Sequence, residues 1–394
     1  MKVLHTADWQ IGKPFARIED ARKRALVQQE RIDAIARLGA LARDEQASLV
    51  LVAGDLFDSP TADKATVSAA CSAIGGIGLP VVVIPGNHDH GGPGTIWKQD
   101  FFLREQREMA PLMTVLLENQ PFECDDAVIL PCPLQRQIES RDLTAWLREA
   151  ELYASLPPGK PRIVLAHGSV AEFGAADDED ELFSGVSGRL DLDRLPMDEL
   201  DYVALGDWHG TKQVTPKAWY SGTHEIDRFP RGEANRPGHV LLATVERGGV
   251  PDVKEFVTGR LGWQSLEHHF ADDHGVEELE ALLREHFGTR ADQDLLQLRL
   301  TGSLGIEAAD ALERLLDTFS SRLLRLKLYD EVVTAPTGDE LAELSGNLSD
   351  PLVAKVATRL VAMLSSGDES AEVAAAALRE LYSAVQREGG DEAS

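Results

Sequence analysis

Residues 48–58 read SLVLVAGDLFD, in which five apolar residues lead into Gly54 and then Asp55. The unbroken apolar run predicts a strand that is covered on both faces. Asp55 follows this strand directly, at the edge where the loops of an open α/β sheet meet and where ligands bind. Gly54 fits a sharp turn or a close backbone approach at that edge. A single aspartate after a strand is more often a helix cap or a turn residue than a ligand, so other stretches of the chain decide its meaning.

Four further stretches also place a potential metal ligand just after an apolar run. They are TADWQ with Asp8 and Gln10, PGNHDH with Asn87 and His88, LAHG with His167, and GDWHG with Asp207 and His209. Each of these residues alone has a structural explanation, as a turn residue or an ordinary hydrogen-bonded side chain. Their joint occurrence at predicted strand ends instead predicts a centre for two divalent metal ions.

The residue types in these stretches suit two-metal hydrolysis. Two ions about 3.5–4 Å apart need a bridging carboxylate, and Asp55 is the predicted bridge because a carboxylate has two oxygens to share. The other predicted ligands divide into Asp8, Gln10 and His209 for one ion and Asn87, His167 and Asp207 for the other. Such a pair would bind phosphate oxygens and activate a water as hydroxide that attacks phosphorus in line.

Two residues are the predicted catalytic side chains. His88 is expected to protonate the leaving oxygen or to steady the charge of the transferring phosphate. Asp58 is expected to orient a neighbouring side chain, with capping of the following helix as the alternative.

The order of apolar patterns predicts the fold. Helical spacing over 19–46 and 62–75 alternates with apolar strands in the first part of the chain, and later strands follow at hairpin-like spacing. We predict a two-sheet α/β sandwich with helices on the outside over residues 1–257. The pattern changes around 258–266, and 258–335 predicts a small α/β capping domain. Residues 336–394 predict C-terminal helices with a disordered tail, and the Pro and Gly residues of 334–350 predict a linker.

Composition limits the function classes. The chain has 394 residues, too many for one core, and its 39 basic and 66 acidic residues give a net charge of −27. An extended basic face for nucleic acid is therefore excluded, and a polyanionic substrate would need metals, local basic residues or a partner. The alternative is that the acidity serves solubility or a salty cytoplasm.

Targeting signals are also absent from the sequence pattern. No stretch approaches 18 uncharged apolar residues, and the first residues lack a signal-peptide core, so we expect a cytoplasmic protein with no membrane contact. The three cysteines form no C-x-x-C pair and predict reduced, structural thiols.

The five stretches resemble the calcineurin-like metallophosphoesterase superfamily, whose pattern is D-x-H, G-D, G-N-H-D/E, H and G-H-x-H. Within it, LHTADW (4–9), LVAGDLFDSPT (51–61) and PGNHD (85–89) most resemble the SbcD-type nuclease subunits of DNA double-strand-break repair. The resemblance is good over 1–257, weaker over 258–335, and only in outline beyond. It implies Mn²⁺-dependent (or Mg²⁺-dependent) exo- and endonuclease cleavage of DNA by a homodimer bound to an SMC-like ATPase of the SbcC type.

The chain departs from the superfamily pattern at two positions. Gln10 stands where D-x-H has its histidine, and Asp207 stands where G-H-x-H has its first histidine. Both residues can still donate an oxygen to a metal, which favours Mn²⁺ or Mg²⁺ over softer ions. Gln10 is expected to hold its ion loosely.

Two other functions are also compatible with the sequence. One is a phosphoesterase acting on cyclic nucleotides or phosphomonoesters, and the other is a non-catalytic scaffold of the same fold. The capping domain and the C-terminal helices, which bind a partner or pack on their own domain, favour the nuclease over the first. The retained ligand set counts against the second.

Two other stretches of the chain carry weaker functional signals. In WYSGTHEIDRF (219–229), His224 and Arg228 are candidate phosphate contacts, with a structural role as the alternative. The acidic run AADDEDE (175–181) predicts a solvated loop near the site, with a regulatory flap as the alternative.

Overall fold

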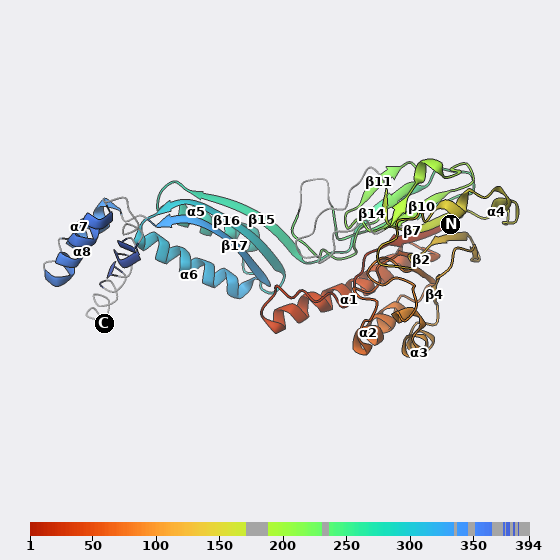
Figure 1. Cartoon of the computed structure of the whole chain (residues 1–394), viewed down its shortest axis with the longest axis horizontal. Helices are drawn as coiled ribbons and strands as arrows, with labels where there is room; N and C mark the ends of the chain where they lie inside the picture. Colours follow the sequence, from red (N-terminus) through yellow and green to blue (C-terminus); the bar gives the residue numbers. More distant parts are fainter. Residues whose placement is uncertain are drawn as a thin grey trace. The chain divides into compact units, whose positions relative to one another are not determined.

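Strand β2 (Leu49–Ala53) lies inside a six-stranded sheet in the computed structural model (Figure 1). All five of its residues are buried, as the apolar run predicts. The strands on either side, β1 (Lys2–Thr6) and β3 (Val81–Ile84), run parallel to it, and helices α1 (Ala21–Asp44) and α2 (Lys64–Gly75) make the connections. The carboxyl ends of these three strands therefore share one edge of the sheet.

The rest of this first sheet follows the order β14-β13-β1-β2-β3-β4. Its outer members and the third helix are β13 (His239–Thr244), β14 (Asp252–Val257), β4 (Met113–Val115) and α3 (Asp100–Met109). β13 pairs antiparallel with β1, and β14 pairs antiparallel with β13.

A second six-stranded sheet has the order β11-β12-β10-β7-β6-β5. Its strands are β11 (Lys212–Thr215), β12 (Ala218–Tyr220), β10 (Tyr202–Gly206), β7 (Arg162–His167), β6 (Val128–Cys132) and β5 (Phe122–Glu123). The central strands β10, β7 and β6 are parallel, so their carboxyl ends also share an edge.

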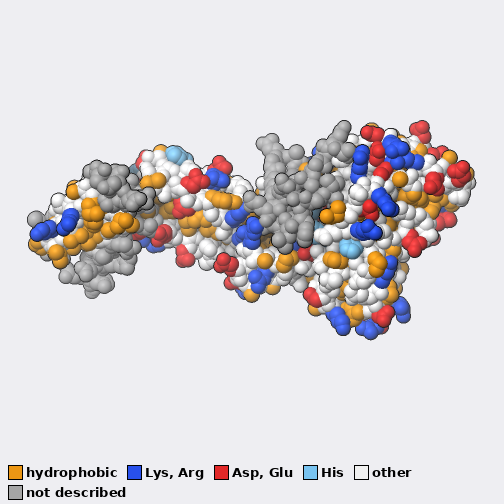
Figure 2. Space-filling view, viewed as in Figure 1, with side chains coloured by type: hydrophobic (Ala, Val, Ile, Leu, Met, Phe, Trp, Pro, Cys, Tyr) orange, Lys and Arg blue, Asp and Glu red, His pale blue; other side chains and the backbone are white. Residues whose placement is uncertain are grey.

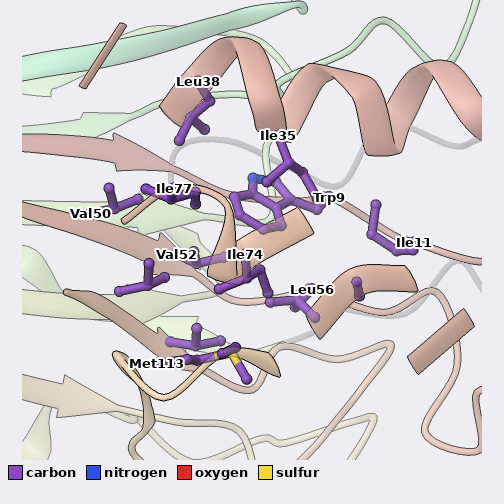
Figure 3. Packing of buried hydrophobic residues seen from close by; sticks show 14 of the residues in the cluster. Trp9, Ile11, Ile35, Leu38, Val50, Val52, Leu56, Ile74, Ile77 and Met113 are labelled. Carbon is purple, nitrogen blue, oxygen red and sulfur yellow. The ribbon is translucent and has the colours of Figure 1, made fainter. Parts of the chain in front are cut away.

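The two sheets pack face to face, and helices cover their outer faces. Leu51 of the first sheet and Leu165 of the second belong to one buried cluster between the sheets. On the other face of the first sheet, Val50 packs with Ile35 of α1 and Ile74 of α2 (Figure 3). This arrangement confirms the predicted α/β sandwich.

The chain divides into two compact units, Met1–Gly262 and Trp263–Ser394. The structure describes residues 1–170, 188–230, 236–334, 337–345, 351–364, 373, 374, 376–378, 381, 382 and 385. The acidic run 175–181 lies outside the described residues.

The second unit contains a three-stranded sheet with two helices, and then further helices. The elements are β15 (Gly262–Phe270), α5 (Gly275–Phe287), β16 (Asp294–Leu304), α6 (Ile306–Arg322), β17 (Arg325–Thr334), α7 (Gly338–Ser345) and α8 (Pro351–Leu364). A cluster that includes Phe270, Leu283, Leu298 and Phe319 forms the core of this sheet and its helices.

Helix α7 lies within the segment 334–350, where the sequence predicts a linker, so that prediction is wrong for these residues. Leu344 is buried in a cluster with Ile306 and Ala357. The free energy gained from this packing outweighs the tendency of the nearby Pro and Gly residues to interrupt a helix. Among the described helices, none has the length and apolar character needed to cross a membrane.

Candidate metal centre

The loops that leave β1 and β2 are hydrogen-bonded to each other through their backbones. The amide of Asp8 donates to the carbonyl of Gly54 at 3.1 Å, and the amide of Gln10 donates to the carbonyl of Asp55 at 2.8 Å. These bonds hold the first two predicted ligand stretches side by side.

Four predicted ligands have left-handed backbone conformations. The φ angles are 54° at Asp8, 42° at Gln10, 53° at Asp55 and 102° at Asp207. Residues other than glycine rarely adopt such angles, and they concentrate at functional sites where the surrounding structure enforces them. The strain therefore marks the same edge that the sequence marks by its residue types.

Three side chains gather at this edge. One potential ligand atom from each of Asp8, Asp55 and His167 lies within 4.8 Å of the other two. All three residues are buried. Buried carboxylates without a counter-charge are costly, so this cluster favours a bound cation.

The Nε2 atom of His167 lies near three side-chain oxygens. Asn87 Oδ1 is 2.8 Å away, and Asp55 Oδ2 and Asp207 Oδ1 are each 3.6 Å away. On the other side of the ring, Nδ1 lies 2.8 Å from the carbonyl of Ala53. If Nδ1–H donates to that carbonyl, Nε2 and Asn87 Oδ1 both present lone pairs, as two ligands of one ion do.

These separations fit a divalent metal. Neighbouring ligands of an octahedral ion with bonds of about 2.1 Å lie about 3 Å apart. The oxygens of Asp55, Asn87 and Asp207 thus lie close enough to His167 Nε2 for the four predicted ligands to share one ion.

The pKa values of His167 and Asp8 also indicate that this cluster needs positive charge. Burial disfavours the charged imidazole of His167, yet the carboxylates of Asp55 and Asp8 outweigh it and raise its pKa to about 9. Burial raises the pKa of Asp8 to about 6, against the opposing charges of the nearby histidines. A proton on His167 thus supplies part of the charge that a metal would supply.

The other predicted position, at Gln10 and His209, is occupied differently. Lys13 Nζ donates to Gln10 Oε1 at 2.9 Å and to Asp227 Oδ2 at 2.8 Å. His209 Nδ1 lies 3.0 Å from the same Asp227 oxygen and 2.6 Å from Arg228 Nη2. Gln10 Nε2 is buried without a hydrogen-bond partner in the described structure.

Lys13 and Asp227 were not predicted from the sequence. Asp227 is fully buried, and although burial opposes its charge, Lys13, His209 and Arg228 hold the pKa of its carboxyl well below the usual range. Lys13 follows Gln10 by three residues and Asp227 directly precedes Arg228, but nothing in this spacing predicts that the loops bring the two residues together.

The two predicted catalytic residues lie beside Asp55. The amide of His88 donates to Asp55 Oδ1 at 2.9 Å, and His88 Nδ1 lies 3.1 Å from the carbonyl of Asp58 and 3.7 Å from its Oδ1. Both side chains are partly exposed. Burial raises the pKa of Asp58, against the charges of His88 and Lys13. Asp58 thus contacts His88, as the prediction of an orienting residue requires.

Two further buried residues hold the loops together. The Asp89 carboxylate accepts from the amides of Gly86 at 2.7 Å and Phe57 at 3.0 Å. Arg31 of α1 donates to the carbonyls of Asp8 and Trp9. Sequence patterns missed both roles, although Asp89 is the last residue of PGNHD.

The two candidate phosphate contacts in 219–229 have different surroundings. Arg228 lies against His209 and is close to the site. His224 is fully buried, with Nε2 2.7 Å from the carbonyl of Arg31, so its prediction as a phosphate contact is wrong. Its ring packs beside the Trp9 ring, with the two centroids 5.3 Å apart.

Comparison with known proteins finds relatives among bacterial nucleases. The SbcD subunit of nuclease SbcCD from Bacillus subtilis (strain 168) is 25% identical over 340 residues, covering 73% of this chain and 84% of that protein. The protein of the same name from Staphylococcus epidermidis (strain ATCC 12228 / FDA PCI 1200) is 25% identical over 223 residues, covering 53% and 57%. A crystal structure of TT1561 from Thermus thermophilus matches with a TM-score of 0.40 at 14% identity, covering 65% of this chain and 98% of that one.

The family model described as Calcineurin-like phosphoesterase matches residues 1–211, more than half of the chain. The predicted superfamily, with its likeness to SbcD-type subunits, and the assignment as a metal-dependent phosphodiesterase are confirmed. The chain belongs to the calcineurin-like phosphoesterase family.

Proposed function

We propose that the protein is the nuclease subunit of an SbcCD-like DNA repair complex and cleaves DNA phosphodiesters as an exo- and endonuclease with two divalent ions, Mn²⁺ or Mg²⁺. One observation carries the proposal. The predicted ligands Asp55, Asn87 and Asp207 surround Nε2 of His167 at ligand-like separations, next to a second set of predicted ligands. The two bacterial relatives are named as nucleases, which supports a nucleic acid as the substrate.

The proposed roles of the side chains follow from their positions. When bound, the ions supply Lewis acidity toward the phosphate oxygens and lower the pKa of a water. Asp55 has one oxygen near His167 and the other bonded to the His88 amide, so it ties the catalytic histidine to the ligand set. His88 Nδ1 lies against the Asp58 carbonyl, and we assign its other ring nitrogen, Nε2, as the atom that would protonate the leaving oxygen.

Binding of DNA requires help beyond the protein's own charge. The net charge is −27, and Figure 2 shows acidic and basic side chains interspersed over the face of the first unit in view. An SMC-like ATPase of the SbcC type would supply the missing attraction and gate cleavage. Exposed Leu352 and Val356 on α8 offer apolar area for such a partner. A homodimer is part of the same proposal, and sedimentation of the purified chain tests it.

The test is degradation of linear DNA with Mn²⁺, measured for wild type and His88→Ala, with a nitrophenyl phosphodiester as the small substrate. We expect the variant to keep its metal and to lose about 10²–10⁴-fold in DNA cleavage, the usual contribution of a general acid. His286→Ala is the matched control, because that histidine is exposed on α5.

Two outcomes would contradict the proposal. If only the small ester were hydrolysed, even with the ATPase present, the protein would be a small-substrate phosphoesterase. If no divalent metal bound, the non-catalytic scaffold would be the remaining explanation.

A further inference from the structure

We propose that the two metal positions are unequal, because the Lys13 ammonium competes with the ion at the Gln10–His209 position. The ion beside His167 would bind tightly, and the second would bind only when it displaces Lys13. This inference rests on the proposed function for the existence of two ions, and it adds a lysine that regulates their occupancy.

The tight position brings its predicted ligands close together. The side-chain atoms of Asn87 and Asp207 already lie 2.8 Å and 3.6 Å from His167 Nε2. Two of these side chains are held from outside: Ser169 Oγ donates to Asp207 Oδ2 at 2.7 Å, and the Ala53 carbonyl lies 2.8 Å from His167 Nδ1. An ion at this position needs little rearrangement of the side chains.

The weak position has its ligand oxygen already bound to a cation. Gln10 Oε1 accepts from Lys13 at 2.9 Å, while Gln10 Nε2 is buried without an acceptor in the described structure. Because the Gln10 amide nitrogen has no hydrogen-bond partner in the described structure, the bond from Lys13 to the amide oxygen is what holds this side chain in place. Lysine is a compact point charge, and here that charge bonds the oxygen that a metal would need.

Lys13 is itself firmly held. Its Nζ also lies 2.8 Å from Asp227, whose side chain is fully buried, and only 13% of the Lys13 side chain is exposed. Asp227 in turn contacts Nδ1 of His209, another predicted ligand of this ion. An incoming ion therefore has to break the bond from Lys13 to the Gln10 oxygen, and Asp227 holds Lys13 in that bond.

Histidine at position 10 would hold the ion more strongly than Gln10 does. An imidazole would present a ring nitrogen to the ion, in place of the amide oxygen that accepts from Lys13. The replacement of the superfamily's histidine by Gln10 and the presence of Lys13 three residues later act together.

Titration of the metal-free full chain with Mn²⁺ by calorimetry and equilibrium dialysis tests the inference. Wild type should bind one ion tightly and a second at least about tenfold more weakly, since breaking charge-assisted hydrogen bonds costs that much or more. Lys13→Met should tighten the weak position by about tenfold or more and leave the tight one unchanged. Gln10→His, which keeps Lys13, should also tighten the weak position and so reduce the difference in affinity between the two ions.

Lys160→Met is the matched control, because Lys160 pairs with the exposed Glu123. Two equal ions in the wild type, or an unchanged or weakened second ion in Lys13→Met, would overturn the inference. If Lys13→Met failed to fold, judged by thermal unfolding, Lys13→Gln, which also removes the charge, would decide in its place. If the chain bound two ions with unequal affinity but cleaved no DNA, the proposed function would be refuted and this inference would stand. If it cleaved DNA but bound two ions with equal affinity, this inference would be refuted and the proposed function would stand.

Discussion

At the scale of single residues, the backbone conformation of the ligands matters as much as their chemistry. Each left-handed residue other than glycine costs about 1–3 kcal/mol, and four of the predicted ligands adopt such angles. The sequence predicted these four residues as ligands, because residue type and strand ends are visible in it, but it did not predict their left-handed backbone. It could not predict Lys13 or Asp227, because their contact joins positions 214 residues apart through loop geometry.

Gly54 illustrates the close packing behind the ligands. Its φ is 91°, and a Cβ placed there would lie 2.2 Å from Nδ1 of His167. We expect Gly54→Ala to lower the free energy of unfolding by more than about 2 kcal/mol and to weaken metal binding, since both strain and a clash arise. Urea unfolding with and without Mn²⁺ measures both effects.

Gly159→Ala serves as the comparison for Gly54→Ala. A Cβ at Gly159 meets nothing within 4 Å, and its φ is not left-handed. This variant should stay within about 0.5 kcal/mol of wild type. If the two substitutions lowered the free energy of unfolding equally, the close approach of Gly54 to His167 would make no special contribution to stability.

The buried His5 predicts a loss of stability in acid. Burial lowers its pKa to about 3, against a hydrogen bond to the Leu205 carbonyl that raises it. Between that value and an unfolded pKa of about 6.5, only the unfolded chain takes up the proton, so stability falls as the pH falls through this window. From pH 7 to pH 5, wild type should lose about 2 kcal/mol relative to His5→Gln. Urea titrations at the two pH values measure this difference, and a difference independent of pH would contradict the assignment.

At the scale of elements, apolar patterns predicted β1, β2, β3, β7 and β10 because buried parallel strands are continuous apolar runs. They failed at α7, where a short helix depends on packing against residues distant in sequence. They also gave no hint that α1 supports the site. Arg31 is buried in this helix and hydrogen-bonds carbonyls of the loop that carries Asp8.

Arg31→Met should therefore act on both folding and metal binding. Removing the guanidinium leaves the buried Asp8 and Trp9 carbonyls without this donor, and we expect a loss of about 3–5 kcal/mol in unfolding free energy. Mn²⁺ affinity should fall as the loop loosens. Arg22→Met, an exposed position of the same helix, should change neither quantity. Urea unfolding and Mn²⁺ titration of the two variants measure both quantities. If the Mn²⁺ affinity of Arg31→Met equalled that of wild type, the role of Arg31 would be purely structural.

At the scale of the whole molecule, every predicted ligand and its described supports lie in the first unit, Met1–Gly262. The clusters that pack both faces of its sheets are formed within the same unit. We expect a fragment of residues 1–262 to fold and to bind Mn²⁺ with the affinities of the full chain. Circular dichroism and metal titration of the fragment test this, and a fragment that folds but binds no metal would show that the second unit contributes to the site.

The backbone bonds between the loops after β1 and β2 have a kinetic consequence. The amides of Asp8 and Gln10 are bonded across to the neighbouring loop, and the Asp58 amide returns to the carbonyl of Ile11. Because these bonds join loops that directly follow two buried strands, we expect the three amides to exchange with solvent much more slowly than amides of exposed loops. Hydrogen exchange of the metal-free chain measures this, and slow exchange would mean that the loops keep their arrangement while the metal is removed and restored.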